Sequence, residues 1–139
     1  MKKITKTLVA ILLIAVLSMT NIVVFAEDGV INPRLSHMNS EEFSFFAYEN
    51  IGYIDVAYSG NDSFVRADLN VKVQKRFLLV FWNDVYEFNA ASTVKNGRFN
   101  HEFDITDGSG MYRAKFSMVV TGNDGTKDTI TETIECEHN

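Results

Sequence analysis

Cysteine and proline are almost absent from this 139-residue chain, which has one of each, Cys136 and Pro33. A secreted domain that depends on disulfides carries its cysteines in pairs, so a disulfide framework within this domain is excluded. The thiol of Cys136 is either idle or available for a bridge to another chain. The sequence has no low-complexity run, charge block or convincing repeat, and its length predicts a single compact domain.

Basic residues are outnumbered by acidic ones. The chain has 13 Lys and Arg against 18 Asp and Glu, and removal of the three lysines in residues 1–26 leaves a net charge of about −8. Nucleic acids and anionic membranes bind surfaces rich in Lys and Arg, so neither is expected as a partner. An extracellular protein, a glycan or calcium is compatible with the acidic balance.

The usual signatures of catalysis are also missing. The chain has no Gly-x-Ser-x-Gly or Cys-x-x-Cys motif, and its three histidines, His37, His101 and His138, lie far apart in the sequence, with His138 in a terminal segment expected to fray. A hydrolytic triad needs a nucleophile, a histidine and an acid together. His101 and its neighbour Glu102 point to opposite faces of a strand, and Cys136 with His138 makes only one pair of zinc ligands. We therefore expect a protein that is not an enzyme and has no required cofactor.

Residues 1–26 have the pattern of a signal peptide. Three lysines precede an apolar run at 8–17, and small residues lead to a cleavage point after Ala26. These are the charged, apolar and cleavage regions of a secretory signal. Cleavage predicts a secreted, extracellular protein with residues 27–139 as one domain. Because residues 8–26 approach the length of a membrane-spanning helix, a retained anchor is the alternative.

Alternation of apolar and polar residues, which is typical of a strand with one buried face, dominates the rest of the chain. It is clearest in two strands whose expected inward residues are Val65, Ala67, Leu69, Val71 and Val73 in 64–74, and Tyr112, Ala114, Phe116, Met118 and Val120 in 111–121. Further strands are predicted at 31–38, 42–48, 51–59, 77–88, 98–106 and 129–136, the second and third joined near Glu49 and Asn50. The segment 77–88, FLLVFWNDVYEF, is apolar on both faces at its start, as in a central strand.

Turn-forming residues separate these runs, at 59–62, 95–97, 107–110 and 122–125. Gly and Asn accept positive φ at such positions, and no segment shows a sustained helical period. Seven or eight short strands in about 110 residues predict an all-β fold, an immunoglobulin-like antiparallel β-sandwich.

The start of the strand 111–121 resembles a tyrosine corner. In immunoglobulin-like domains a tyrosine near the start of the sixth strand turns its hydroxyl back to the backbone. Gly110 and Tyr112 have that Gly-x-Tyr spacing, and Ala114 stands where antibody domains have a cysteine. We interpret Gly110 and Tyr112 as this structural corner; the alternative is an ordinary core tyrosine.

Trp82 is the only tryptophan in the chain. Strict alternation places it on one face with Leu78, Val80, Tyr86 and Phe88. A face that begins with two aliphatic residues is typical of a core, so a core anchor is the first interpretation of Trp82. The alternative is a stacking platform for sugar rings made by Trp82 and Tyr86, as in a small carbohydrate-binding domain.

Four aspartates in or beside the expected loops are candidate calcium ligands: Asp104, Asp107, Asp124 and Asp128. Calcium takes six to eight oxygen ligands, so loops that meet at one end of a sandwich could form a composite site. The spacing around Gly125 does not fit a calcium-binding EF-hand loop, and a hairpin turn explains its Asn-Asp-Gly sequence. A calcium-stabilised, adhesion-type module is therefore an alternative function.

Three motifs, INPR at 31–34, GMYR at 110–113 and VTGNDGT at 120–126, resemble those of a group of small secreted proteins of Gram-positive bacteria, whose function is uncharacterised. The resemblance implies a secreted immunoglobulin-like sandwich and carries no catalytic residues. We predict a secreted or cell-surface-associated, non-enzymatic binding or structural module. Its partner is an extracellular protein or a glycan, and not a membrane once the signal is cleaved.

Overall fold

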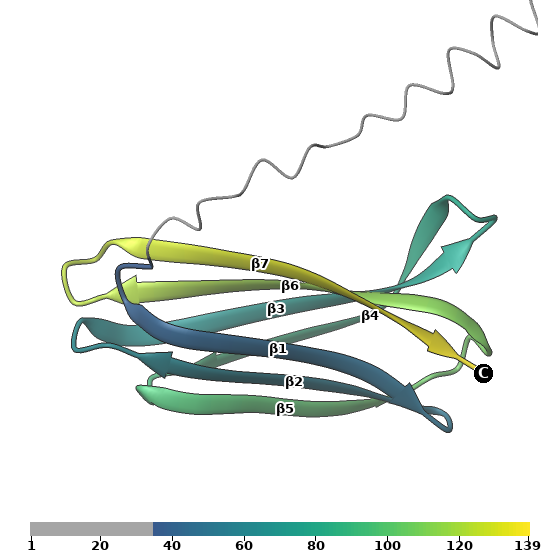
Figure 1. Cartoon of the computed structure of the whole chain (residues 1–139), viewed down its shortest axis with the longest axis horizontal. Helices are drawn as coiled ribbons and strands as arrows, with labels where there is room; N and C mark the ends of the chain where they lie inside the picture. The colour runs from purple at the N-terminus through teal and green to yellow at the C-terminus, as the bar shows by residue number, and fades with distance from the viewer. Residues whose placement is uncertain (1–34) are drawn as a thin grey trace, which may run out of the picture. The chain divides into compact units, whose positions relative to one another are not determined.

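Residues 35–139 are described by a computed structural model, in which seven strands form two sheets (Figure 1). The predicted all-β sandwich is confirmed, and its assignment to the immunoglobulin-like group stays a prediction. The predicted signal peptide and residues 27–34 lie outside the described residues. In the described range, no helix is long and apolar enough to cross a membrane. The strands are β1 (Met38–Tyr48), β2 (Ile51–Gly60), β3 (Phe64–Phe77), β4 (Phe81–Ser92), β5 (Asn96–Asp104), β6 (Gly110–Gly122) and β7 (Lys127–His138).

The two sheets have the strand orders β1-β2-β5 and β4-β3-β6-β7, and every pair of neighbouring strands is antiparallel. The chain therefore changes sheet between β2 and β3, between β4 and β5, and between β5 and β6. Figure 1 shows the two sheets lying face to face, with the strands of both running in similar directions. Each sheet thus has one face toward the core and one outer face.

The core forms where the apolar faces of the two sheets meet. In β6 every predicted inward residue, from Tyr112 to Val120, is buried, and in β3 the same holds from Ala67 to Val73. Val65 is the exception, because a register shift between Phe64 and Arg66 interrupts the alternation and leaves Val65 exposed. The three-stranded sheet contributes buried side chains that include Phe45, Ile54, Val56, Phe99 and Phe103.

The prediction of a central strand over 77–88 is wrong. Strand β3 continues to Phe77, residues 78–80 form a hairpin turn, and β4 lies at the edge of its sheet. Leu78 and Leu79 have positive φ angles of 48° and 67°, and the Val80 N–H donates to the Leu78 carbonyl at 2.8 Å. No residue of this turn is a usual turn former. The apolar pattern of the sequence therefore continues through the turn and gives no sign of it.

A β-bulge in β4 separates Trp82 from Tyr86. Tyr86 pairs with Val73 and Asp84 pairs with Gln74, so the residue between them, at position 85, has no place in the register. One extra residue reverses the alternation of faces. Tyr86 therefore points toward the core and Trp82 points outward, so the predicted shared face and the core anchor are both wrong.

Candidate functional site

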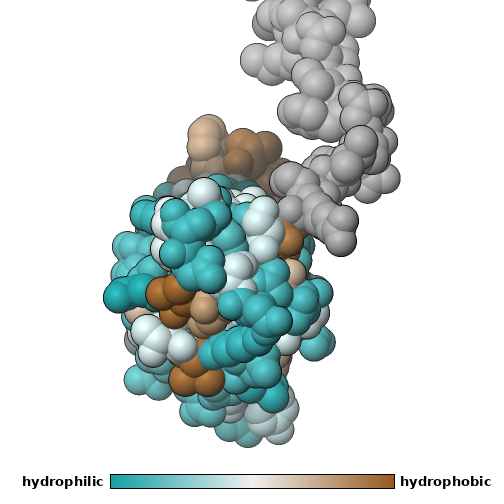
Figure 2. All heavy atoms as spheres, turned by 90° about the vertical axis from the view of Figure 1, so that its left-hand side faces the viewer, coloured by the Kyte–Doolittle hydropathy of each residue, from teal (hydrophilic) through white to brown (hydrophobic). Residues whose placement is uncertain are grey.

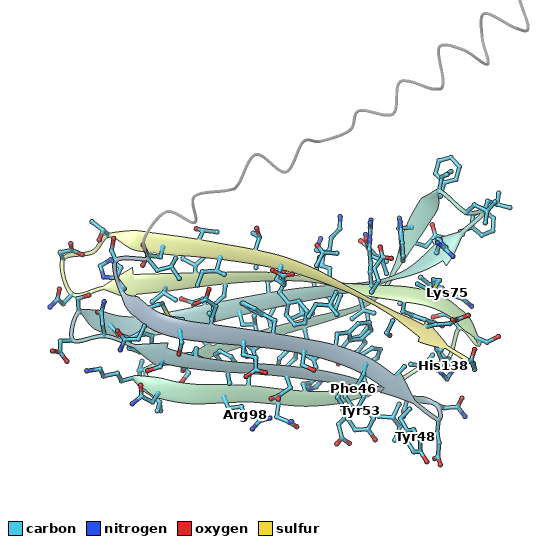
Figure 3. All side chains as sticks on the ribbon, viewed as in Figure 1. Phe46, Tyr48, Tyr53, Lys75, Arg98 and His138 are labelled. Carbon is cyan, nitrogen blue, oxygen red and sulfur yellow. The ribbon has the colours of Figure 1, made fainter. Side chains whose placement is uncertain are left out.

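Three aromatic side chains lie on the outer face of the three-stranded sheet, where β1 ends and β2 begins. Phe46 is 48% exposed and Tyr48 is 65% exposed, and Tyr53 lies opposite Phe46 in the register of the two strands. The rings of Phe46 and Tyr53 are stacked, with centroids 4.8 Å apart and planes inclined by 12°. Figure 3 shows the three side chains gathered at one end of this sheet. We call Phe46, Tyr48 and Tyr53 the aromatic patch.

Polar side chains continue the same face beside the aromatic patch. On β5, Glu102 lies opposite Tyr53 and Asn100 lies opposite Asp55. The guanidinium of Arg98 donates from Nε to Asp55 Oδ1 at 2.6 Å and from Nη2 to Oδ2. These hydrogen bonds, with the charge of Arg98, hold the pKa of Asp55 below its ordinary value. Asp55 is therefore an ionised, oriented acceptor next to the stacked rings.

This combination suits a ligand that has both apolar faces and hydroxyl groups. A cluster of aromatic rings exposed to water is typical of an interaction site. A ring offers an apolar face to the C–H groups of a sugar, while carboxylates accept hydrogen bonds from hydroxyl groups and an amide or guanidinium donates to them. The aromatic patch with Asp55, Arg98, Asn100 and Glu102 supplies all of these groups on one face.

The platform predicted from Trp82 and Tyr86 does not form. Trp82 is half-buried on the outer face of the four-stranded sheet, where the guanidinium carbon of Arg113 lies 4.1 Å from the centre of its ring. Tyr86 lies between the sheets, and its ring stacks on Phe103 with centroids 4.3 Å apart. Its hydroxyl makes a 2.7 Å hydrogen bond with Nε2 of His101. The two residues cannot contact one ligand together.

An open hollow of about 450 Å³ lies on the outer face of the four-stranded sheet, lined by residues of β3, β4 and β6. No aromatic residue lines it. Its central amide is already satisfied, because Asn70 Nδ2 donates to Glu87 Oε1 at 2.7 Å and to Asn89 Oδ1 at 2.8 Å. The hollow therefore offers a ligand less than the aromatic patch does.

The four predicted calcium ligands are divided between the two ends of the sandwich. Asp104 ends β5 and Asp107 follows it, whereas Asp124 and Asp128 lie at the β6–β7 turn, beyond the 13-residue strand β6. A strand of that length spans about 40 Å. The predicted composite site is not formed by these four residues, and among residues 35–139 no three His, Cys, Asp or Glu side chains are grouped to hold a metal ion.

Asp124 and Asp128 instead surround the buried His37, which precedes β1. The His37 ring hydrogen-bonds Ser63 Oγ through Nδ1 and Thr126 Oγ1 through Nε2, both at 2.7 Å, and its backbone N–H donates to Asp128 Oδ2 at 2.8 Å. Asp124 Oδ1 accepts from the hydroxyl and the N–H of Thr126, which lowers the pKa of Asp124. Both ring nitrogens are occupied, so His37 ties the segment before β1 to the β2–β3 connection and to the β6–β7 turn. Sequence reasoning missed this network.

The surroundings of Tyr112 contain the contact expected of a corner tyrosine. Its side chain is 1% exposed, and its hydroxyl donates to the Gly108 carbonyl at 2.5 Å. Gly110 has a φ of +139°, which favours glycine. The His138 ring packs edge-on against Tyr112, and His138 is a buried strand residue, so the expectation that it frays is wrong. Burial raises the pKa of the half-buried Cys136 thiol, which fits an idle thiol.

Comparison with known proteins gives no family for this chain. No family model and no curated protein sequence matches it. Similar solved structures include wild-type OgpA from Akkermansia muciniphila, at 15% identity over 75% of this chain and 31% of that chain, with a TM-score of 0.41. Another is catalytically inactive OgpA from the same organism in complex with an O-glycopeptide (glycodrosocin) substrate, at 15% identity over 78% of this chain and 34% of that chain, with a TM-score of 0.41. This chain spans about a third of the length of those chains, and a likeness at this level carries no argument about function.

Proposed function

We propose that this domain is a non-enzymatic carbohydrate-binding module, exported from the cell, whose ligand lies on the outer face of the β1-β2-β5 sheet. The observation that carries the proposal is the aromatic patch, in which Phe46 and Tyr53 stack in contact with water beside the Asp55–Arg98 pair. A face that served only to keep the sheet hydrated would favour polar residues at these positions.

The arrangement is ordered before a ligand arrives. Stacking fixes the Phe46 and Tyr53 rings against each other, and the two hydrogen bonds from Arg98 fix the Asp55 carboxylate. Groups that are already held in place lose less conformational entropy on binding. Tyr48 extends the aromatic surface by one further ring at the end of β1. The patch therefore fits a chain of sugar units that runs along the end of the sheet.

The test is a binding screen with soluble β-linked glucan, xylan and chitin oligosaccharides, followed by calorimetry with the oligosaccharide that binds best. Phe46→Ala is expected to weaken that binding about tenfold, the value of one aromatic stacking contact. Because Phe46 is half-exposed, the variant should keep the melting temperature of the wild type within a few degrees.

Trp82→Phe is the matched control, since Trp82 is an aromatic residue on the opposite outer face. Its affinity for the oligosaccharide is expected to equal that of the wild type. Absence of binding to every oligosaccharide of the panel would overturn the proposal. Loss of binding in Trp82→Phe with full binding in Phe46→Ala would move the site to the four-stranded sheet and would also overturn it.

A further inference from the structure

The β3–β4 hairpin ends in five consecutive apolar residues that are in contact with water. Their side chains are between 52% and 82% exposed. Figure 1 shows this hairpin rising away from the two sheets, and Figure 2 shows apolar spheres standing behind the end of the domain that faces the viewer. We call these residues the apolar tip: Phe77, Leu78, Leu79, Val80 and Phe81.

The backbone of the apolar tip is unfavourable for the residues that form it. Leu78 and Leu79 both have positive φ, a region that Gly and Asn enter readily and residues with large side chains avoid. An Asn-Gly pair would make such a turn with less strain and with better hydration. The two leucines are therefore unfavourable both for the backbone of the turn and for exposure to water. They would be favourable in contact with an apolar surface that removes them from water.

Cations and a tryptophan surround the base of the apolar tip. Arg76 precedes it, and Arg113 of β6 lies over the ring of Trp82, the residue that follows the tip. Lys75 is directed elsewhere, because its Nζ donates to the Asp107 carbonyl and lies 5.7 Å from the centre of the Tyr112 ring. Residues 75–83 include two cations and no acid, and the acids beside them, Asp84 and Asp107, lie in the same hollow as Lys75 and Arg76. None of the ion pairs within residues 35–139 involves Lys75, Arg76 or Arg113. Tryptophan and basic residues beside an apolar segment are typical of a membrane–water interface.

We propose that the apolar tip inserts into the surface of a phospholipid bilayer, with Arg76 and Arg113 at the level of the lipid phosphates. From the Phe77–Phe81 pair to the end of the turn the hairpin extends about 5–8 Å. Interfacial segments bury their apolar residues to a depth of about 5–10 Å. The tip is long enough to reach the acyl boundary and too short to cross the bilayer.

The same charges argue against a second copy of this chain as the occupant. Two apolar tips packed against each other would bring their basic residues together, and like charges in contact are destabilising. Lipid phosphates are the complementary charge. The proposal replaces the sequence-based expectation of no membrane contact, because that expectation used the net charge of the chain and not the local charge around the hairpin.

The chain has its own reporter for this contact, because its only tryptophan, Trp82, lies at the base of the hairpin. The experiment titrates residues 27–139, the form expected after cleavage of the predicted signal, with vesicles of phosphatidylcholine containing a minor share of phosphatidylglycerol. Insertion is expected to shift the Trp82 emission to shorter wavelength and to make the protein float with the vesicles. No shift together with no flotation would overturn the proposal.

Leu78→Asn with Leu79→Gly is the decisive variant, since both new residues adopt positive φ and the fold should be kept. Loss of two inserted leucines is expected to weaken vesicle binding about a hundredfold. Val94→Asn is the control, because Val94 is also an exposed apolar residue but lies in the β4–β5 connection at the other end of β4. It is expected to bind vesicles like the wild type.

Equal vesicle binding by the double variant and the wild type would overturn the proposal. A second result would also overturn it: the wild type forms concentration-dependent dimers, the double variant does not, and neither protein binds vesicles. The occupant of the apolar tip would then be a second copy of the chain. Arg76→Gln is expected to weaken binding and to reduce its dependence on salt; an unchanged salt dependence would overturn the role of the cations. Phe46→Ala should bind vesicles normally, which separates this inference from the proposed glycan site.

Discussion

Replacement of Tyr112 by phenylalanine removes one hydroxyl group at the start of β6 and keeps the buried ring. The hydroxyl donates to the Gly108 carbonyl at 2.5 Å, and the side chain is 1% exposed. Gly108 itself is exposed, so water can hydrate its carbonyl when the hydroxyl is gone. The loss is therefore that of one neutral hydrogen bond, about 1 kcal/mol, and not the larger cost of an unsatisfied buried acceptor.

A loss of 1 kcal/mol lowers the melting temperature of a domain of this size by about 4–8 °C. Calorimetry of Tyr112→Phe measures this change in melting temperature. Hydrogen exchange locates the loss of stability, because the amides of residues 105–109 should exchange faster in the variant. Tyr58→Phe is the matched control, because the buried Tyr58 donates to the Val94 carbonyl at 2.9 Å in the β4–β5 connection. It should speed exchange in residues 93–95 and not in 105–109.

The Tyr112 hydroxyl also predicts a change of stability with alkaline pH. Burial raises the pKa of Tyr112 above its ordinary value near 10, and the charges of Asp107 and of an ionised Cys136 raise it further. The unfolded chain then loses this proton at a lower pH than the folded protein. The contribution to stability is complete below about pH 10 and falls as the pH rises toward the pKa of the folded state. Tyr112→Phe should show a smaller alkaline loss of stability than the wild type.

An unchanged melting temperature in Tyr112→Phe, or normal exchange in residues 105–109, would refute the role of Tyr112 as a corner that holds the β5–β6 connection. An alkaline loss equal to that of the wild type would refute the assignment of that loss to the Tyr112 proton. The two results are independent, because one depends on the hydrogen bond and the other on the burial of the ring.

The other predictions concern the hairpin, the buried histidine and the aromatic patch. Leu78→Asn with Leu79→Gly should raise the melting temperature by several degrees, because relief of about 1–2 kcal/mol of strain per residue exceeds the entropic cost of one glycine. His37→Leu should destabilise the fold by about 1–2 kcal/mol in urea unfolding, because it removes the ring's hydrogen bonds to Ser63 and Thr126, whose hydroxyls keep other partners. Arg98→Gln should remove a contribution that is present above about pH 4 and is lost as the pH falls through the lowered pKa of Asp55; a stability–pH curve that matches the wild type would contradict it.

Most of the fold could be predicted from the sequence because alternation and turn chemistry agree along most of the chain. In β6 each inward position is apolar and each turn beside it contains glycine, so local preference and burial favour the same structure. The turn near Glu49 and Asn50 was predicted for the same reason, and Glu49 has the positive φ of a tight turn. The prediction failed at Val65 and at position 85, where one residue changes the register and no residue type signals the change.

The aromatic patch was missed, although its pairing follows from the predicted turn. A two-residue turn at 49–50 pairs residues that are equally distant from it, so Phe46 must lie opposite Tyr53. In the structure the side chains alternate there, with Phe45 inward and Phe46 outward. What the pattern could not show is which of two neighbouring phenylalanines faces the core, because both are equally apolar. Trp82, predicted as the platform, lies on the outer face of the other sheet.

The prediction failed at the turn 78–80 for a different reason, and this reason bears on function. Phe and Val favour strands, and Leu avoids positive φ, so every local preference in this segment opposes the turn that it forms. Such conflicts between local preference and structure are expected at functional sites, where a requirement other than folding selects the residues. A hairpin that only joined β3 to β4 would be served by Asn and Gly. The leucines are unfavourable for the backbone and for solubility in water, and they become favourable only when the tip leaves the water, which is the situation that a bilayer surface provides.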